Sequence, residues 1–129
     1  MVCRPHAHSG EDKARMNLDI YRGDDATILR LSGDLDSDSN PLLREQLREL
    51  VDEVENALLI DMTGVRYLNS AILGSFIQAY RLLGEKSIPM RFYGMTRKVK
   101  SIFLITKLDG ILDIYDDEKE AMKSLPEKS

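Results

Sequence analysis

Histidine and cysteine are scarce in this 129-residue chain, which holds two histidines and one cysteine. Both histidines, His6 and His8, come before residue 9, so a domain folded from the rest of the chain has no imidazole to act as a catalytic base. Cys3 has no second cysteine to pair with, which fits a reducing compartment. Two histidines in a tail are weak evidence for a metal site. We therefore predict neither a Ser-His-Asp or Cys-His enzyme nor a metal centre.

Long apolar runs and dense basic segments are also missing. No run approaches the roughly 18 apolar residues of a membrane span, and the first fifteen residues lack the apolar core of a signal peptide. We expect a cytoplasmic protein without direct membrane insertion. The net charge is −4, and the densest basic run, Arg97–Lys100, suits a solvated helix start, so we predict no nucleic-acid partner. The glycine patterns of dinucleotide and P-loop sites do not occur, and no cofactor is predicted.

The remaining composition is that of a globular domain. Hydrophobic residues make up 43% of the chain and charged residues 31%. A chain of this length buries roughly two-thirds of its unfolded surface, which suffices for one core. We predict a flexible N-terminal arm over residues 1–16, one domain over 17–125 and a short C-terminal tail over 126–129.

Strand-like and helix-like hydrophobic patterns alternate along the domain. A helix is expected to begin at Asn40, as the cap, with Pro41 in its first turn and an apolar stripe behind it. Further helices are expected over 70–84, 98–107 and 118–125, and strands over 17–22, 26–33, 57–62, 88–95 and 111–115. This order predicts an α/β fold with a mixed, mostly parallel sheet of about five strands and four helices.

One stretch, Leu59–Gly74, carries the main functional signal. An apolar run stops at Asp61, a short polar turn is expected to follow, and a helical pattern begins at Asn69 and Ser70. A serine at a helix start stands where unpaired amides and the helix dipole favour a phosphate. The same pair also suits ordinary helix capping. Asp61, at an expected strand end, suits either a functional group or a turn cap.

The first turn of that helix is unusually apolar. Ala71, Ile72 and Leu73, with Phe76, supply more apolar surface than one buried stripe requires. We therefore expect part of this turn to face a binding partner.

An acidic segment, Asp34–Asp38, resembles a calcium-binding loop together with Glu45. Ser39, however, stands where that loop needs a glycine, and Pro41 interrupts it. Acidic residues near a helix start, where the dipole favours them, are the better interpretation, so we predict no calcium site.

The order of these motifs resembles the STAS domain of anti-sigma-factor antagonists over residues 17–125. The resemblance is carried by Gly33–Asp36, Leu59–Val65, Ser70–Gly74 and Val99–Phe103. In that family a partner kinase, which is also the anti-sigma factor, phosphorylates a serine or threonine, and a phosphatase restores it. The resemblance implies a non-enzymatic regulatory protein in a partner-switching system, with an anti-sigma-factor-type serine kinase and a serine phosphatase as its partners.

The resemblance also implies the site. Ser70 corresponds to the phosphate acceptor, while Asn69 replaces an aspartate, Ala71 a second hydroxyl residue and Ile72 a glycine of the usual segment. The implied docking surface around Ser70 comprises Asp36, Ser37, Asn69, Ala71, Ile72 and Leu73. We expect a monomer or a weak homodimer.

Another class of function stays open at this point. STAS-like modules also serve as constitutive subunits of transporter complexes, including lipid-handling ABC systems, without any phosphate cycle. Ile72 favours this alternative slightly, because a fixed apolar contact suits a permanent interface.

Overall fold

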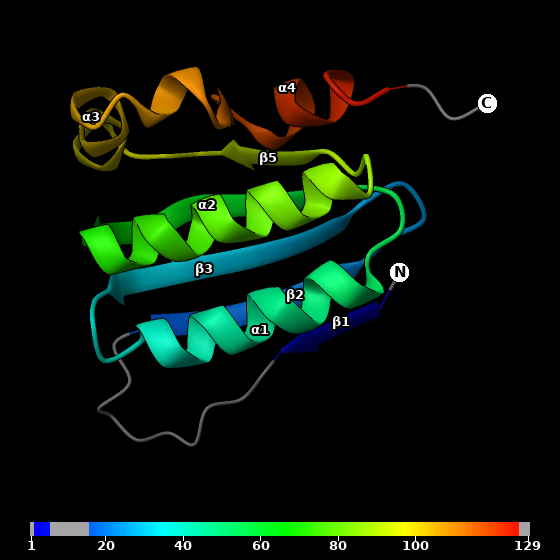
Figure 1. The fold of residues 1–129 in the computed structure, drawn as a ribbon, viewed down its shortest axis with the longest axis horizontal. Helices are drawn as coiled ribbons and strands as arrows, with labels where there is room; N and C mark the ends of the chain where they lie inside the picture. Colours follow the sequence, from blue (N-terminus) through cyan, green and yellow to red (C-terminus); the bar gives the residue numbers. More distant parts are fainter. Residues whose placement is uncertain (1, 6–15, 127–129) are drawn as a thin grey trace.

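Six strands form one sheet in the order β1-β2-β3-β4-β5-β6 (Figure 1). The computed structural model describes residues 2–5 and 16–126. The strands are β1 (Val2–Pro5), β2 (Met16–Arg22), β3 (Thr27–Leu35), β4 (Leu58–Leu68), β5 (Met90–Tyr93) and β6 (Asp113–Tyr115). The helices are α1 (Asn40–Glu53), α2 (Ser70–Glu85), α3 (Arg97–Ile105) and α4 (Glu118–Lys123), with a 3₁₀ turn, η1, at Leu108–Gly110.

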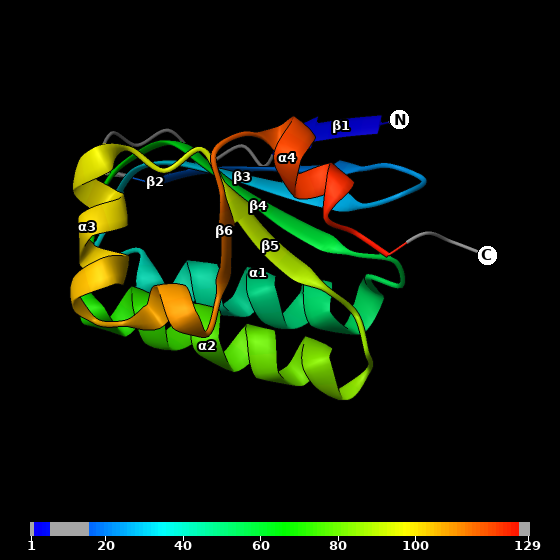
Figure 2. The ribbon, with the colours of Figure 1, turned by 90° about the horizontal axis from the view of Figure 1, so that it is seen from above.

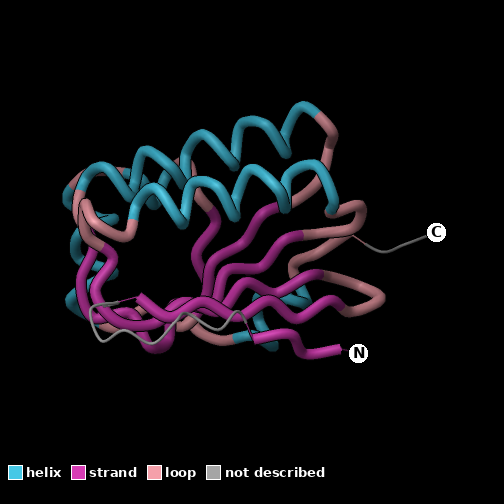
Figure 3. The backbone as a smooth tube through the Cα atoms, turned by 90° about the horizontal axis from the view of Figure 1, so that it is seen from below, coloured by secondary structure: helices cyan, strands magenta, loops and turns pink. Residues whose placement is uncertain are grey.

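The sheet is mixed, with antiparallel pairing at the β1 edge and parallel pairing from β3 to the β6 edge. β2 pairs antiparallel with β1 and β3, whereas β3, β4, β5 and β6 pair in parallel. Parallel neighbours need crossover connections, and α1 and α2 supply two of them on the same face of the sheet (Figure 2). Figure 3 shows these two helices side by side over the strands, while α4 lies on the opposite face. The predicted α/β class and four helices are confirmed.

Part of the predicted N-terminal arm is a strand. Val2–Pro5 pairs antiparallel with Asp19–Arg22, and β2 begins one residue before the predicted domain boundary, at the buried Met16. Four residues are too few to show a hydrophobic pattern in the sequence. Such a short edge strand is defined by its backbone pairing instead. The sheet therefore has one strand more than the expected five. His6 and His8 lie outside the described residues.

The main core lies between the sheet and the inner faces of α1 and α2. The α1 stripe is buried as its spacing predicted, from Leu43 through Leu47 and Leu50. Phe76 of α2 stands edge-on to Phe92 of β5, with ring centroids 5.0 Å apart. None of the described helices is long and apolar enough to cross a membrane.

β4 runs six residues further than the sequence predicted. The expected polar turn after Met62 is strand, and the β3–β4 pairing shifts register twice, between Arg30 and Ser32 and between Gly33 and Asp34. At each shift β4 contributes one extra residue, as a β-bulge does. Exposed residues consequently come in pairs along β4, which breaks the alternation by which a strand is recognised in sequence.

Candidate functional site

Two chain segments meet where β3 and β4 end. Because these strands are parallel neighbours, the loop that follows β3 and the start of α2 lie at the same edge of the sheet. The Asn69 side-chain amide donates a hydrogen bond to Ser37 Oγ over 3.1 Å and joins the two segments. Residues 32 positions apart in sequence thereby form one continuous surface.

Asn69 also caps α2. Its backbone is extended, with φ −115° and ψ −178°, and its side-chain oxygen accepts from the Ile72 amide at 3.1 Å. Ser70 is the first helical residue and is exposed, as is Ala71. Their amides belong to the first turn, which has no intrahelical acceptors, so the positive end of the helix dipole lies beside the Ser70 hydroxyl.

The loop after β3 is held by the Asp36 carboxylate. Asp36 Oδ1 accepts from the amides of Asp38 at 3.1 Å and Ser39 at 3.2 Å, and from Ser39 Oγ at 3.1 Å. The helix cap is Ser39, one residue earlier than predicted. Asn40 instead begins α1, and its side-chain oxygen accepts from Ser75 Oγ of α2 at 2.7 Å. Within residues 2–5 and 16–126, no group of three His, Cys, Asp or Glu residues could hold a metal ion.

Two of the predicted docking residues are buried. Ile72 is 0% exposed and Leu73 is 6% exposed, so their side chains belong to the core and cannot present a docking surface. The expectation that the apolar first turn faces a partner is therefore wrong for these two residues. A helix that packs on a sheet buries a stripe at least 100° wide, and this stripe takes up both side chains. The accessible part of the predicted site comprises Asp36, Ser37, Asn69, Ser70 and Ala71.

A second exposed surface was missed. Leu104 and Ile105 at the end of α3 and Ile111 after η1 are exposed, Ile105 to 79%. We call these three residues the α3 patch. α3 stands at the end of the sheet where α2 begins (Figure 2). The sequence signal is the apolar run Ile102–Ile105, because four consecutive helical residues cannot all face the core.

Asp61 does not belong to the site around Ser70. β4 continues through Leu68, so Asp61 lies inside the strand rather than at its end. It is buried, and its Oδ2 accepts from Arg30 Nε at 3.0 Å while its Oδ1 accepts from the Thr63 amide at 2.9 Å. Asp61 therefore forms a structural ion pair within the sheet, and its bond to the amide two residues on is the part of the turn-cap interpretation that holds.

Tyr93 of β5 predicts how stability depends on alkaline pH. Its hydroxyl is buried without a hydrogen-bond partner in the described part of the chain. Burial raises the pKa of Tyr93 well above its ordinary value, and the charges of Asp61 and Glu118 raise it further. Above about pH 10 the unfolded chain ionises this tyrosine while the folded chain does not, so the free energy of unfolding should fall as pH rises.

Tyr93→Phe is the matching variant. At pH 7 the variant should unfold at an equal or higher urea concentration than the parent. Its free energy of unfolding should be higher by up to about 1 kcal/mol, because the substitution removes an unpaired buried hydroxyl. It should also lose stability less steeply than the parent between pH 9 and about pH 11. Parallel pH slopes for the two proteins in urea titrations would contradict the assignment.

Comparison with known proteins adds the family context. A family model described as "STAS domain" matches residues 17–121. An anti-sigma-B factor antagonist of Listeria monocytogenes is 29% identical over 108 residues, which cover 81% of this chain and 95% of that protein. The chain is thus similar to that relative over nearly the relative's whole length.

Solved structures share the fold. An anti-sigma factor antagonist from Mycobacterium paratuberculosis superposes with a TM-score of 0.79 at 22% identity, covering 85% of this chain and 93% of the other. The Bacillus cell fate determinant SpoIIAA in its phosphorylated form superposes with a TM-score of 0.64 at 14% identity, covering 82% and 96%. At these identities the likeness concerns the fold alone.

Proposed function

The chain belongs to the STAS domain family, and on that premise we propose that it is an anti-sigma-factor antagonist, a non-enzymatic protein switched by phosphorylation of Ser70. The observation that carries this proposal is the exposed Ser70 at the first position of the 16-residue helix α2. A relative of the same fold exists in a phosphorylated form, which supports a phosphate cycle in this fold. The partners are an anti-sigma factor with serine kinase activity and a phosphatase that removes the phosphate.

The docking surface has a polar and an apolar part. The polar part is the segment pair joined by Asn69 and Ser37, with Asp36, Ser70 and Ala71 beside it. α3, which carries Leu104 and Ile105 of the α3 patch, stands at the same end of the sheet (Figure 2). The patch supplies exposed aliphatic side chains that one partner can bury. The apolar contact would give affinity for the partner, and modification of the neighbouring Ser70 hydroxyl would lower that affinity.

A phosphate on Ser70 would leave the fold of the chain stable but would weaken binding of the partner. It adds about −1.5 to −2 charge, which the N-terminus of α2 stabilises. The same charge must be desolvated when a partner covers it, and it adds to the negative charge of the neighbouring Asp36 loop. Phosphorylation should therefore release the partner without unfolding the antagonist.

The test compares two variants of the acceptor. Ser70→Asp should lower affinity at least about tenfold, or about 1.4 kcal/mol, for the anti-sigma factor captured on the unmodified chain, while Ser70→Ala stays within about twofold. With ATP, the captured partner should add one phosphate to the parent and none to Ser70→Ala, by intact mass and peptide mapping.

Ser87→Asp is the matched control, since Ser87 is also exposed but follows the C-terminal end of α2. It should bind like the parent. Equal calorimetric affinities for Ser70→Asp and Ser87→Asp would overturn the switch.

The alternative, a constitutive subunit of a transporter complex, loses the one residue that favoured it. Ile72 favoured it slightly as an interface residue, and Ile72 is buried in the core. Recovery of a transporter ATPase in constant stoichiometry, with no phosphate added to Ser70, would nevertheless favour it over the antagonist.

A further inference from the structure

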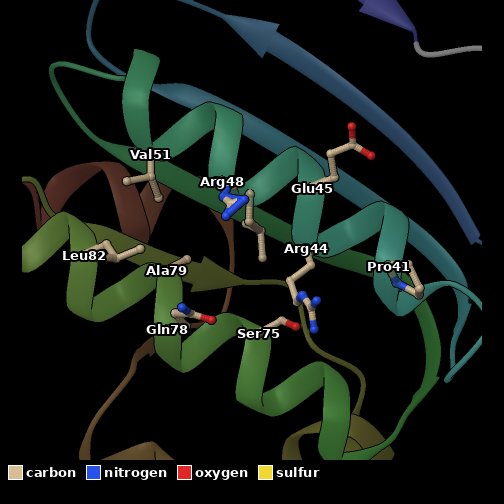
Figure 4. Close-up of a pocket in the computed structure, with 10 residues that line it drawn as sticks. Pro41, Arg44, Glu45, Arg48, Val51, Ser75, Gln78, Ala79 and Leu82 are labelled. Carbon is tan, nitrogen blue, oxygen red and sulfur yellow. The ribbon is translucent and has the colours of Figure 1, made fainter.

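A groove runs between α1 and α2 on the side of these helices away from the sheet (Figure 4). Its volume is about 610 Å³, within the range of small-molecule sites. The residues that line it are Pro41, Arg44, Glu45, Leu47, Arg48, Val51, Ser75, Gln78, Ala79 and Leu82. None of the proposed docking residues is among them, although Ser75 also donates to the Ala71 carbonyl at 3.3 Å, so the groove begins beside the Ser70 surface.

The floor of the groove is buried and made by small or aliphatic residues. Ser75 and Ala79 lie one turn apart on α2, and Leu47 and Val51 lie one turn apart on α1. Short side chains at two successive turns of α2 leave the space that the groove occupies. The Ser75 hydroxyl already donates a hydrogen bond to Asn40, so the floor does not require a polar group of a ligand as a hydrogen-bond partner.

The lining changes from polar to apolar along the groove. α1 and α2 both follow parallel strands and therefore run in the same direction. Arg44 lies at the end nearer the helix starts, Arg48 and Gln78 lie further along, and Val51 and Leu82 lie beyond them. An elongated ligand would accordingly need a polar head and an apolar tail.

The polar end is positively charged. Neither Arg44 nor Arg48 forms an ion pair with any residue of the described segments. In Figure 4 the guanidinium group of Arg44 is directed toward α2, whereas the carboxylate of Glu45 is directed away from it. Two unpaired guanidinium groups at i and i+4 favour an acidic head group, which they can bind with charge-assisted hydrogen bonds.

We infer that this groove binds a small amphipathic anion with a carboxylate head and an aliphatic tail. Arg44, Arg48 and Gln78 hold the head, and the tail lies over Val51, Ala79 and Leu82. The eight residues from Arg44 to Val51 span about 10 Å of helix, the length of a chain of about eight to ten carbons. The inference does not depend on Ser70 or on the proposed function.

The test titrates the full-length chain with sodium decanoate and follows backbone amide shifts by NMR. We expect saturable binding with shifts confined to α1 and α2. Butyrate, which lacks the tail, and decyltrimethylammonium, which reverses the charge, should each bind at least about tenfold more weakly. No saturation below about 5 mM decanoate, a free energy weaker than about −3 kcal/mol, would overturn the inference.

Variants separate a specific site from general detergent-like binding. The double variant Arg44→Gln with Arg48→Gln should lose at least about fivefold in decanoate affinity because it removes charged donors. Arg81→Gln is the matched control, since Arg81 is exposed on α2 and does not line the groove. Equal losses in the two proteins, or shifts centred on the α3 patch, would overturn the inference, provided that circular dichroism shows both proteins folded.

Discussion

Arg30→Met is expected to lower the free energy of unfolding by about 3 kcal/mol, more than Asp61→Asn does. The two members of this ion pair are unequally buried, since the Arg30 side chain is 46% exposed and that of Asp61 only 7%. Removing the arginine leaves a largely buried carboxylate without its charged partner, with the Thr63 amide as its remaining donor. Removing the charge of Asp61 leaves a guanidinium that is already half solvated.

Arg30 also makes contacts that methionine partly retains. Its guanidinium lies 4.6 Å from the ring centroid of Tyr21 and donates to the Tyr21 hydroxyl at 3.1 Å. Methionine keeps an unbranched apolar stem against that ring, so the variant isolates the loss of charge better than alanine would. Urea titrations of the parent, both single variants and the double variant give the coupling between the two residues.

The exposed pair Arg66–Asp34 is the control for this prediction. Its atoms lie 3.4 Å apart and its side chains are 72% and 37% exposed, so Arg66→Met should cost less than about 1 kcal/mol. An Arg30→Met variant as stable as Arg66→Met would show that the buried carboxylate does not need its partner.

The helices could be predicted because the spacing of their apolar residues is compatible with only one type of secondary structure. In α1 the spacing of Leu43, Leu47 and Leu50 fits only a helix, and all three are buried. The start of α2 was likewise correct, because asparagine before an apolar-periodic segment is a strong cap signal and Asn69 does accept from the Ile72 amide. Local chemistry determines these features, so the sequence shows them directly.

The strand that leads to the site could not be predicted in full. Thr63 and Gly64 look like a turn, yet they lie in β4 at a register shift that depends on the partner strand β3. At Gly64 a β-carbon would lie 2.6 Å from the β-carbon of Ser32, so the glycine serves a close approach between strands rather than a chain reversal. A contact between strands 32 residues apart leaves no local signal.

The surface of the site was predicted in position but not in composition. Ser70 and Ala71 are exposed as expected, whereas Ile72 and Leu73 are buried. The sequence of an apolar helix start does not tell whether its extra apolar side chains face the core or a partner. The width of the sheet beneath the helix decides this. The most exposed aliphatic side chain is instead Ile105 of α3, which has no layer to pack against in the described structure.

Gly94→Ala is the second variant with a large expected effect, about 2 kcal/mol of lost stability. Gly94 follows β5 with φ +80°, a left-handed conformation that costs an alanine about 1–2 kcal/mol. A β-carbon there would also lie 2.3 Å from Thr63 Oγ1 and 3.3 Å from the Thr63 amide nitrogen. Adding Thr63→Ala removes the first contact but neither the second nor the backbone strain, so the double variant should recover only part of the loss.

The position of α3 depends on this close approach. The Gly94 amide donates to the Tyr115 carbonyl at 3.3 Å, and two residues later Thr96 caps α3 by accepting from the Val99 amide at 3.2 Å. Gly94→Ala should therefore displace α3 and weaken partner binding through the α3 patch, with part of the affinity returning in the double variant. Gly74→Ala is the control, because apart from the neighbouring backbone of α2 no atom lies within 4 Å of its added β-carbon, and α2 should gain up to about 1 kcal/mol. If Gly94→Ala proved as stable as Gly74→Ala, β4 and the segment before α3 could not be as close as the structure has them, and α3 would have to be placed by its own contacts with the core.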